Sequence, residues 1–161
     1  MESLKEEIMR VHKCAEHVVI ESNSYTVSLL QFTDPREFVV ISTETRGKCS
    51  LDDVNAIFAC MTEFMENNPE NSPCYCIIDL SRTDTFTLQQ IHAAAESLIK
   101  IKALLETRLV GSIIKVNEDQ SDNGYVTNLF QRIYTPVRPI LWYNSPGEGS
   151  EFIRKWEDEL K

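Results

Sequence analysis

Two cysteines separated by one residue, Cys74 and Cys76, form the most reactive pair of side chains that this sequence places close together. Thiolates bind zinc or exchange disulfides, and Cys49 and Cys60 would be the further ligands of a metal site. The alternative is core packing, because residues 74–80 are almost uninterruptedly apolar and a thiol in such a run behaves as a small hydrophobic group. A Cys-x-Cys on an extended strand lacks the tight turn of a Cys-x-x-Cys. We therefore expect packed core cysteines and no metal site, with a thiol redox protein as the competing alternative.

Motifs for other common chemistries are absent from the sequence. The chain has five glycines, which form neither a Gly-x-Ser-x-Gly nucleophile turn nor a glycine-rich phosphate loop. The histidines His12, His17 and His92 fall in different predicted elements, so they indicate neither a metal cluster nor a Cys/His dyad. We predict no catalytic residues, no cofactor and no enzymatic activity.

The first third of the chain combines a helix pattern with strand patterns. Residues 3–18 place apolar side chains at intervals of three and four, which predicts a short amphipathic helix. Residues 24–32 and 37–45 alternate and are rich in β-branched side chains on either side of a turn, which predicts an antiparallel hairpin. Residues 17–21 are a further candidate for a short strand before the hairpin.

The rest of the chain alternates between buried strands and helices. The expected elements are a helix from Ser50 to Pro69, a strand over 74–80, a helix over 88–105, a strand over 109–116, a helix over 126–133, a strand over 139–143 and a helix over 150–160. Such alternation requires right-handed crossovers between parallel strands. We therefore predict an α/β fold with a mixed, mainly parallel sheet covered by helices. It forms a single domain of residues 1–161, with residues 1–18 as an appended N-terminal helix.

Polar side chains follow the predicted parallel strands, where ligands commonly bind in open α/β sheets. The candidates at this rim are Ser81, Arg82, Thr85, Thr87 and Lys115. In a chain with a net charge of −9, the cations Arg82 and Lys115 are its most informative members. The rim is either a recognition surface for a partner or a solvated edge, and Thr87 with Gln90 also matches a helix-capping pattern.

Residues 76–87, CIIDLSRTDTFT, resemble the strand and switch loop of the sulfate-transporter and anti-sigma-factor-antagonist (STAS) superfamily, where a buried strand ends in Asp-Leu-Ser. Residues 129–139 and 152–156 are similar to its SpoIIAA-like branch, in which an aromatic-rich helix, a short strand and a closing helix with a late Trp recur. The resemblance spans about residues 20 to 160 and implies a SpoIIAA-like fold. Thr87-Leu88-Gln89-Gln90 stands where antagonists of that superfamily carry a phosphorylatable Ser followed by Gly, so we do not transfer the phosphoswitch.

The resemblance implies a non-catalytic protein-interaction or regulatory module, which is our leading hypothesis. The architecture that this branch shares with CRAL-TRIO lipid-binding domains implies the alternative, a binding domain for a small apolar ligand. Its cleft would lie between helices and sheet, and the candidates for its wall are Phe86, Leu129, Phe130, Tyr134 and Trp142. The same side chains also fit plain core packing.

Composition limits the partners. The net charge of −9 and a pI near 4.8 mean that nucleic-acid phosphates and anionic lipid surfaces repel the protein as a whole. No apolar run approaches the roughly eighteen residues of a membrane span, and five irregularly spaced cysteines do not match a secreted disulfide framework. We expect a cytoplasmic protein without an integral membrane segment. Its partner is an unknown protein or a small apolar ligand, and a homodimer through the N-terminal helix is a further alternative.

Overall fold

The computed structural model describes residues 2–69, 72–84, 86–116, 123–143 and 145–160, and for residues 123–126 it describes the backbone alone. The strands are β1 (Ala15–Glu21), β2 (Tyr25–Phe32), β3 (Phe38–Gly47), β4 (Cys74–Thr83), β5 (Leu109–Lys115) and β6 (Ile140–Trp142). The helices are α1 (Leu4–Val11), α2 (Leu51–Asn67), α3 (Leu88–Lys100), α4 (Lys102–Arg108), α5 (Asn123–Ile133) and α6 (Glu148–Leu160).

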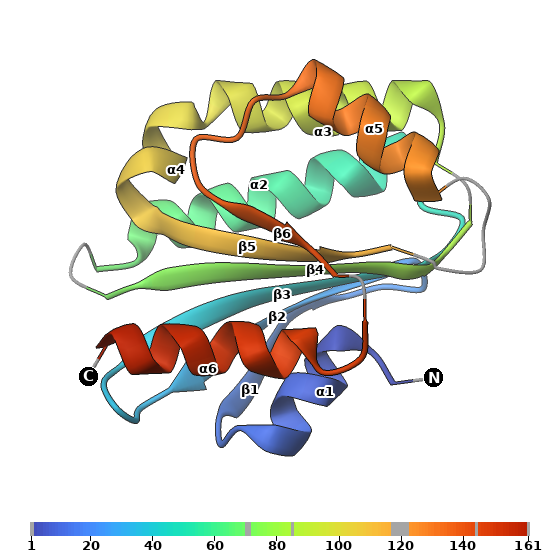
Figure 1. The fold of residues 1–161 in the computed structure, drawn as a ribbon. Helices are drawn as coiled ribbons and strands as arrows, with labels where there is room; N and C mark the ends of the chain where they lie inside the picture. The colour runs from blue at the N-terminus through green and yellow to red at the C-terminus, as the bar shows by residue number, and fades with distance from the viewer. Residues whose placement is uncertain (1, 70–71, 85, 117–122, 144, 161) are drawn as a thin grey trace.

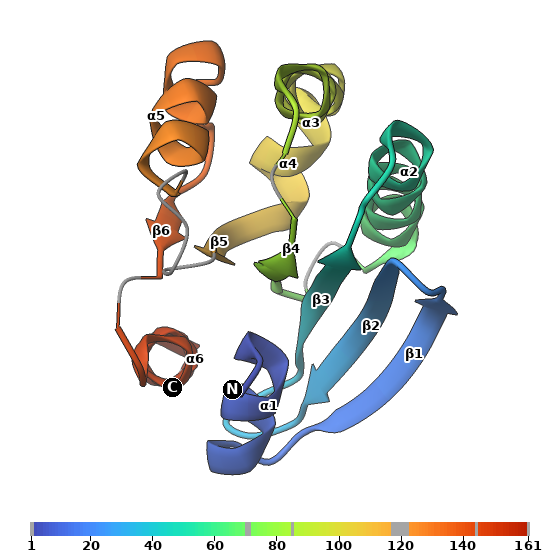
Figure 2. The ribbon, with the colours of Figure 1, turned by 90° about the vertical axis from the view of Figure 1, so that its right-hand side faces the viewer.

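The strands form one sheet with helices on both faces. Its order is β1-β2-β3-β4-β5-β6, antiparallel from β1 to β3 and parallel from β3 to β6. Helices α2, α3, α4 and α5 lie on one face and α1 and α6 on the other (Figures 1 and 2). This arrangement confirms the predicted mixed, mainly parallel sheet covered by helices.

Helix starts follow the local capping chemistry that the sequence indicated. At the start of α2, Ser50 Oγ accepts a hydrogen bond from Asp53 N over 3.1 Å, and Asp53 Oδ2 accepts one from Ser50 N over 2.9 Å. Thr87 and Gln90 exchange the same pair of bonds at the start of α3. Each cap satisfies backbone N–H groups that have no partner within the helix.

The N-terminal helix is shorter than predicted. It ends at Val11, and residues from Ala15 onward form β1, which pairs with β2. The helical spacing over 3–18 was misleading because Val18, Val19 and Ile20 favour a strand once β2 offers hydrogen-bonding partners.

Helix α1 is also part of the domain core. Leu4 and Ile8 are 1% and 0% exposed, so the apolar face proposed for joining two subunits is used within the chain.

A second difference concerns the helix expected over 88–105. The chain leaves helical geometry at Ile101, where φ is −105° and ψ is 21°, and so forms α3 and α4. The bend places Leu105, which is 2% exposed, in the core beside α2. Apolar spacing continues across the break, so the sequence pattern does not reveal it.

Each face of the sheet has its own hydrophobic core. Under α1 and α6, Tyr75 packs against Phe38 and Trp156, with ring centroids 5.6 and 5.1 Å apart. A Cβ at Gly111 would lie 3.3 Å from Trp156 Cζ2, which explains glycine within this strand. The opposite core contains Met61 and other side chains of α2.

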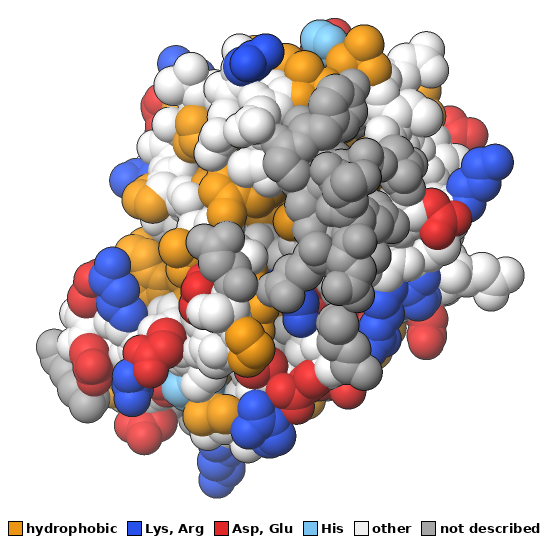
Figure 3. All heavy atoms as spheres, turned by 45° about the vertical axis from the view of Figure 1, so that its right-hand side comes forward, with side chains coloured by type: hydrophobic (Ala, Val, Ile, Leu, Met, Phe, Trp, Pro, Cys, Tyr) orange, Lys and Arg blue, Asp and Glu red, His pale blue; other side chains and the backbone are white. Residues whose placement is uncertain are grey.

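The surface is unevenly charged. In Figure 3, acidic and basic side chains gather over the lower part of the molecule, where α1 and α6 lie, and patches of hydrophobic side chains are exposed above α6. Within the described ranges, no helix has the length and apolar character needed to cross a membrane.

Candidate functional site

Hydrogen bonds join α1 to the rim that the sequence predicts at the strand ends. Asp79 is 4% exposed, and its Oδ2 accepts a hydrogen bond from the backbone N of Leu4 over 2.7 Å. Its Oδ1 accepts bonds from Ser81 N and Ser81 Oγ over 2.9 and 2.5 Å. Asp79 therefore satisfies the first turn of α1, and Ser81 orients this carboxylate.

Both predicted rim cations also face α1. Lys115 is only 7% exposed; its Nζ donates to the carbonyl of Glu2 over 3.1 Å and lies 4.8 Å from the centroid of the Tyr143 ring. The guanidinium of Arg82 lies 3.5 Å from Glu6 Oε1 on the exposed side of the helix. These contacts hold α1 across the ends of β4 and β5.

The remaining rim candidates do not join this cluster. Thr87 caps α3, with its Oγ1 accepting from Gln90 N over 3.2 Å, and Thr85 lies outside the described residues. The structure thus brings Ser81, Arg82 and Lys115 together around α1 and leaves Thr87 in its capping position.

Sequence reasoning missed a second buried carboxylate of this region, Glu7. It is 5% exposed and accepts hydrogen bonds from Tyr143 Oη, Gly147 N and Ser150 N over 2.7, 3.0 and 2.9 Å. A negative charge at this place stabilises the N-terminus of α6, whose first N–H groups have no partner within the helix. Its partners lie about 140 residues away along the chain, so no local pattern signals its role.

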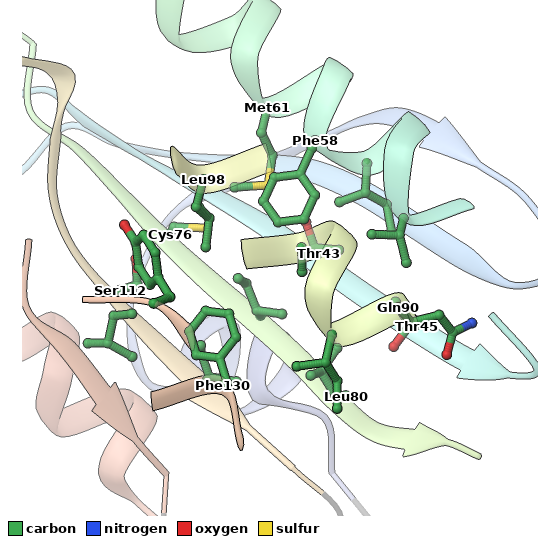
Figure 4. Close-up of a pocket in the computed structure, with 18 of the residues that line it drawn as sticks. Thr43, Thr45, Phe58, Met61, Cys76, Leu80, Gln90, Leu98, Ser112 and Phe130 are labelled. Carbon is green, nitrogen blue, oxygen red and sulfur yellow. The ribbon is translucent and has the colours of Figure 1, made fainter. Parts of the chain in front are cut away.

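The opposite face of the sheet holds a cavity of about 150 Å³ between β3, β4, β5, β6 and helices α2, α3 and α5. Its wall is almost entirely apolar. The side chains that face one another across it in Figure 4 are Thr43, Phe58, Met61, Cys76, Leu98, Ser112 and Phe130.

The aromatic residues predicted for an apolar cleft meet at this cavity. Phe86, Phe130, Tyr134 and Trp142 line it, whereas Leu129 does not. The Phe130 ring lies with its centroid 5.4 Å from that of Tyr134 and 6.1 Å from that of Trp142. A second, surface hollow of about 260 Å³ shares Phe130, Tyr134 and Trp142 with the cavity wall.

Other wall residues were not singled out from the sequence. Phe58 and Met61 lie on the apolar stripe of α2, and Thr43 and Ser112 lie on buried strands. A stripe that lines a cavity has the same spacing as one that fills a core, so the pattern contains no signal that separates them.

The paired cysteines lie in the core on the cavity side of the sheet, as core packing predicted. Burial raises the pKa of the Cys74 thiol to about 12 and also raises that of Cys76. The neutral thiol is a poor nucleophile, because the thiolate is the reactive form.

Alkylation of the native protein at pH 8 is therefore expected to spare both of these cysteines. Iodoacetamide should label the half-buried Cys14 and Cys60 first, and Cys74 and Cys76 only after denaturation, as followed by mass spectrometry over time. Rapid labelling of Cys74 and Cys76 in the native protein would instead favour the thiol redox alternative.

Comparison with solved structures supports the fold. The crystal structure of an uncharacterised protein from the DUF3478 family, from Shewanella loihica PV-4 and with a SpoIIAA-like fold, matches with a TM-score of 0.52 at 12% sequence identity. The match covers 83% of this chain and 98% of that chain. No protein-family model and no curated protein matches the sequence. The fold of this chain is therefore SpoIIAA-like, as the sequence resemblance implied, and at this identity the likeness concerns the fold alone.

Proposed function

We propose that this protein is a non-catalytic binding protein that takes up a small, mainly apolar molecule in the cavity between the sheet and α2, α3 and α5. The cavity itself carries the proposal. Protein interiors are normally close-packed, so an apolar space of about 150 Å³ between a sheet and its helices is unusual. A ligand that fills this space would bury its own apolar surface there, which favours binding.

The chemistry of the wall supports an apolar occupant. Among the described wall residues, the ionisable ones are Cys49, Cys76, Tyr134 and Arg138. Burial raises the pKa of the two thiols and of the Tyr134 hydroxyl, so these groups are neutral at physiological pH. Such a wall favours burial of hydrocarbon, and its neutral groups support binding rather than acid–base catalysis.

A route into the cavity is supported by the neighbouring surface hollow. Phe130, Tyr134 and Trp142 contribute to both spaces, and the hollow is completed by the exposed Gln131 and Pro136. We propose that the ligand enters between α5 and β6, where rotation of these aromatic side chains opens the wall.

The leading hypothesis from the sequence, a protein-interaction or regulatory module, stays a prediction. Its candidate residues are already bonded within the chain, Ser81 to Asp79, Arg82 to Glu6 and Lys115 to the carbonyl of Glu2. A partner at that rim would have to compete with these contacts, whereas a ligand in the cavity displaces none of them. The cavity is for this reason the better-supported site.

Filling the cavity by mutation tests the proposal. Ala94 of α3 lines the cavity, and Ala94→Leu places an isobutyl group where the ligand would lie. We expect at least a tenfold weaker affinity for toluene, measured by NMR titration, with a melting temperature that is unchanged or higher because cavity filling stabilises a fold.

The matched control is Ala59→Leu. Ala59 is exposed on α2 and away from the cavity wall, so the same change there should leave the affinity for toluene unaltered. Equal toluene affinity in wild type and Ala94→Leu would contradict the proposal, as would a wild type that binds no toluene.

A further inference from the structure

We infer that the ligand of the cavity carries one neutral hydrogen-bonding group that reaches Thr43; this inference rests on the proposed binding function. Thr43 lies on β3 and is 2% exposed, and its side chain lies on the cavity wall (Figure 4). Its Oγ1 has no hydrogen-bond partner among the described protein groups. A buried hydroxyl without a partner destabilises the fold, so a partner supplied by a ligand would contribute directly to binding.

Two other polar side chains of the wall, Thr45 and Gln90, are already bonded within the protein. The Oγ1 of Thr45 is hydrogen-bonded to that of Thr83. The side-chain amide of Gln90 donates to the carbonyl of Cys49, and its Oε1 accepts from Thr87 N over 3.0 Å. Thr43 differs from them because it lies on the cavity wall and its buried hydroxyl has no hydrogen-bond partner in the described part of the protein.

The rest of the wall determines that this group is uncharged. Of the wall residues that the structure describes, Arg138 alone carries a charge, and its exposed guanidinium donates to the carbonyl of Glu106. A carboxylate or ammonium group at Thr43 would be buried among Phe58, Met61 and similar side chains without a counter-ion, which is strongly unfavourable. A hydroxyl or carbonyl meets no such penalty, because a threonine hydroxyl can donate to it or accept from it.

The cavity volume sets the size class of the ligand. A void of about 150 Å³ is comparable to one that accepts a single benzene ring in other proteins. The ligand class is therefore a compact alcohol, phenol, aldehyde or ketone whose hydrocarbon part packs against the aromatic wall. A long acyl chain would have to extend outward through the hollow beside Trp142.

A matched pair of probes and a matched pair of variants test this inference. Phenol and toluene have nearly the same shape, and phenol carries a hydroxyl group where toluene carries a methyl group. Thr43→Val keeps the β-branched shape and removes the hydroxyl, whereas Thr43→Ser keeps the hydroxyl. We expect Thr43→Val to weaken the affinity for phenol about fivefold and to change the affinity for toluene less than twofold, as measured by NMR titration.

Two further readouts distinguish a ligand contact from a structural role. Thr43→Ser should retain the wild-type ratio of the phenol and toluene affinities. Thr43→Val should raise the melting temperature of the ligand-free protein, because it removes an unpaired buried hydroxyl. Benzoate, a charged probe of similar size, should not bind.

The outcomes separate the two proposals. If phenol and toluene both bind but Thr43→Val changes both equally or changes neither, the role of Thr43 is wrong and the binding function stands. Tight binding of benzoate would overturn the neutral class of ligand. If neither phenol nor toluene binds wild type, both the inference and the proposed function fail.

Discussion

Replacement of Glu7 by alanine is expected to lower the free energy of unfolding by about 3–4 kcal/mol, because a buried, hydrogen-bonded charge leaves its donors unsatisfied when it is removed. The donors are Tyr143 Oη and the backbone N–H groups of Gly147 and Ser150, all within 3.0 Å. The loss also removes the negative charge at the N-terminus of α6. For a chain of this length, the melting temperature should fall by about 10 °C, as measured by circular dichroism or calorimetry.

A surface glutamate provides the control for this prediction. Glu66 is exposed on α2, and Glu66→Ala should change the stability by no more than about 0.5 kcal/mol. A double-mutant cycle of Glu7→Ala with Tyr143→Phe should show a coupling of about 1 kcal/mol or more, because each partner loses its bond when the other is removed. Similar stabilities of Glu7→Ala and Glu66→Ala would mean that α1 does not hold α6 in place through this carboxylate.

Local chemistry accounts for the parts of the fold that could be predicted from the sequence. Capping residues such as Ser50 and Thr87 act on backbone groups three positions away, and the hairpin of β2 and β3 is formed by neighbouring segments. Signals of this kind lie within a short stretch of chain. Where tertiary pairing competes with local periodicity, as at residues 15–18, the helix prediction failed, whereas the candidate strand over residues 17–21 is confirmed as part of β1.

Only one wall of the cavity, the one formed by α5 and β6, could be predicted from the sequence. Phe130, Tyr134 and Trp142 are close along the chain, and the fold resemblance suggested a cleft near them. The opposite wall comes from α2 and β3, where Met61 and Thr43 match the patterns of core residues. Whether such residues enclose a void depends on how tightly distant helices pack, and one sequence does not encode that in its spacing.

The two faces of the sheet therefore differ in chemistry. On one face, charged groups such as Asp79 and Glu7 join α1 to the strand ends and to α6. On the other face, apolar side chains surround a cavity, and Thr43 Oγ1 on its wall lacks a partner among the residues that the structure describes. Mutations of the charged groups around α1 should change mainly stability and mutations of the cavity wall mainly ligand binding, which allows the two effects to be separated.

Gly149 offers a second test of the joint between α1 and α6. This residue is buried in the first turn of α6, and an added Cβ would collide with Glu7 Oε2 and lie 2.5 Å from Leu4 Cδ1. On an exposed helical position, replacement of glycine by alanine is favourable by up to about 1 kcal/mol. Here we expect Gly149→Ala to destabilise the protein by about 2–3 kcal/mol, measured by urea denaturation, because the buried ends of the Glu7 and Leu4 side chains must shift from their present positions.

The double variant Glu7→Ala/Gly149→Ala distinguishes a clash with Glu7 from a general loss of helix stability. In Gly149→Ala, the new methyl group pushes the Glu7 carboxylate away from Ser150 N, so part of the loss is the same loss that Glu7→Ala causes. The double variant should therefore be more stable than the sum of the single effects predicts, by about 1 kcal/mol. If the two changes in the free energy of unfolding are strictly additive, Gly149→Ala does not act through Glu7. If Gly149→Ala stabilises the protein, the two helices are not closely packed at this position.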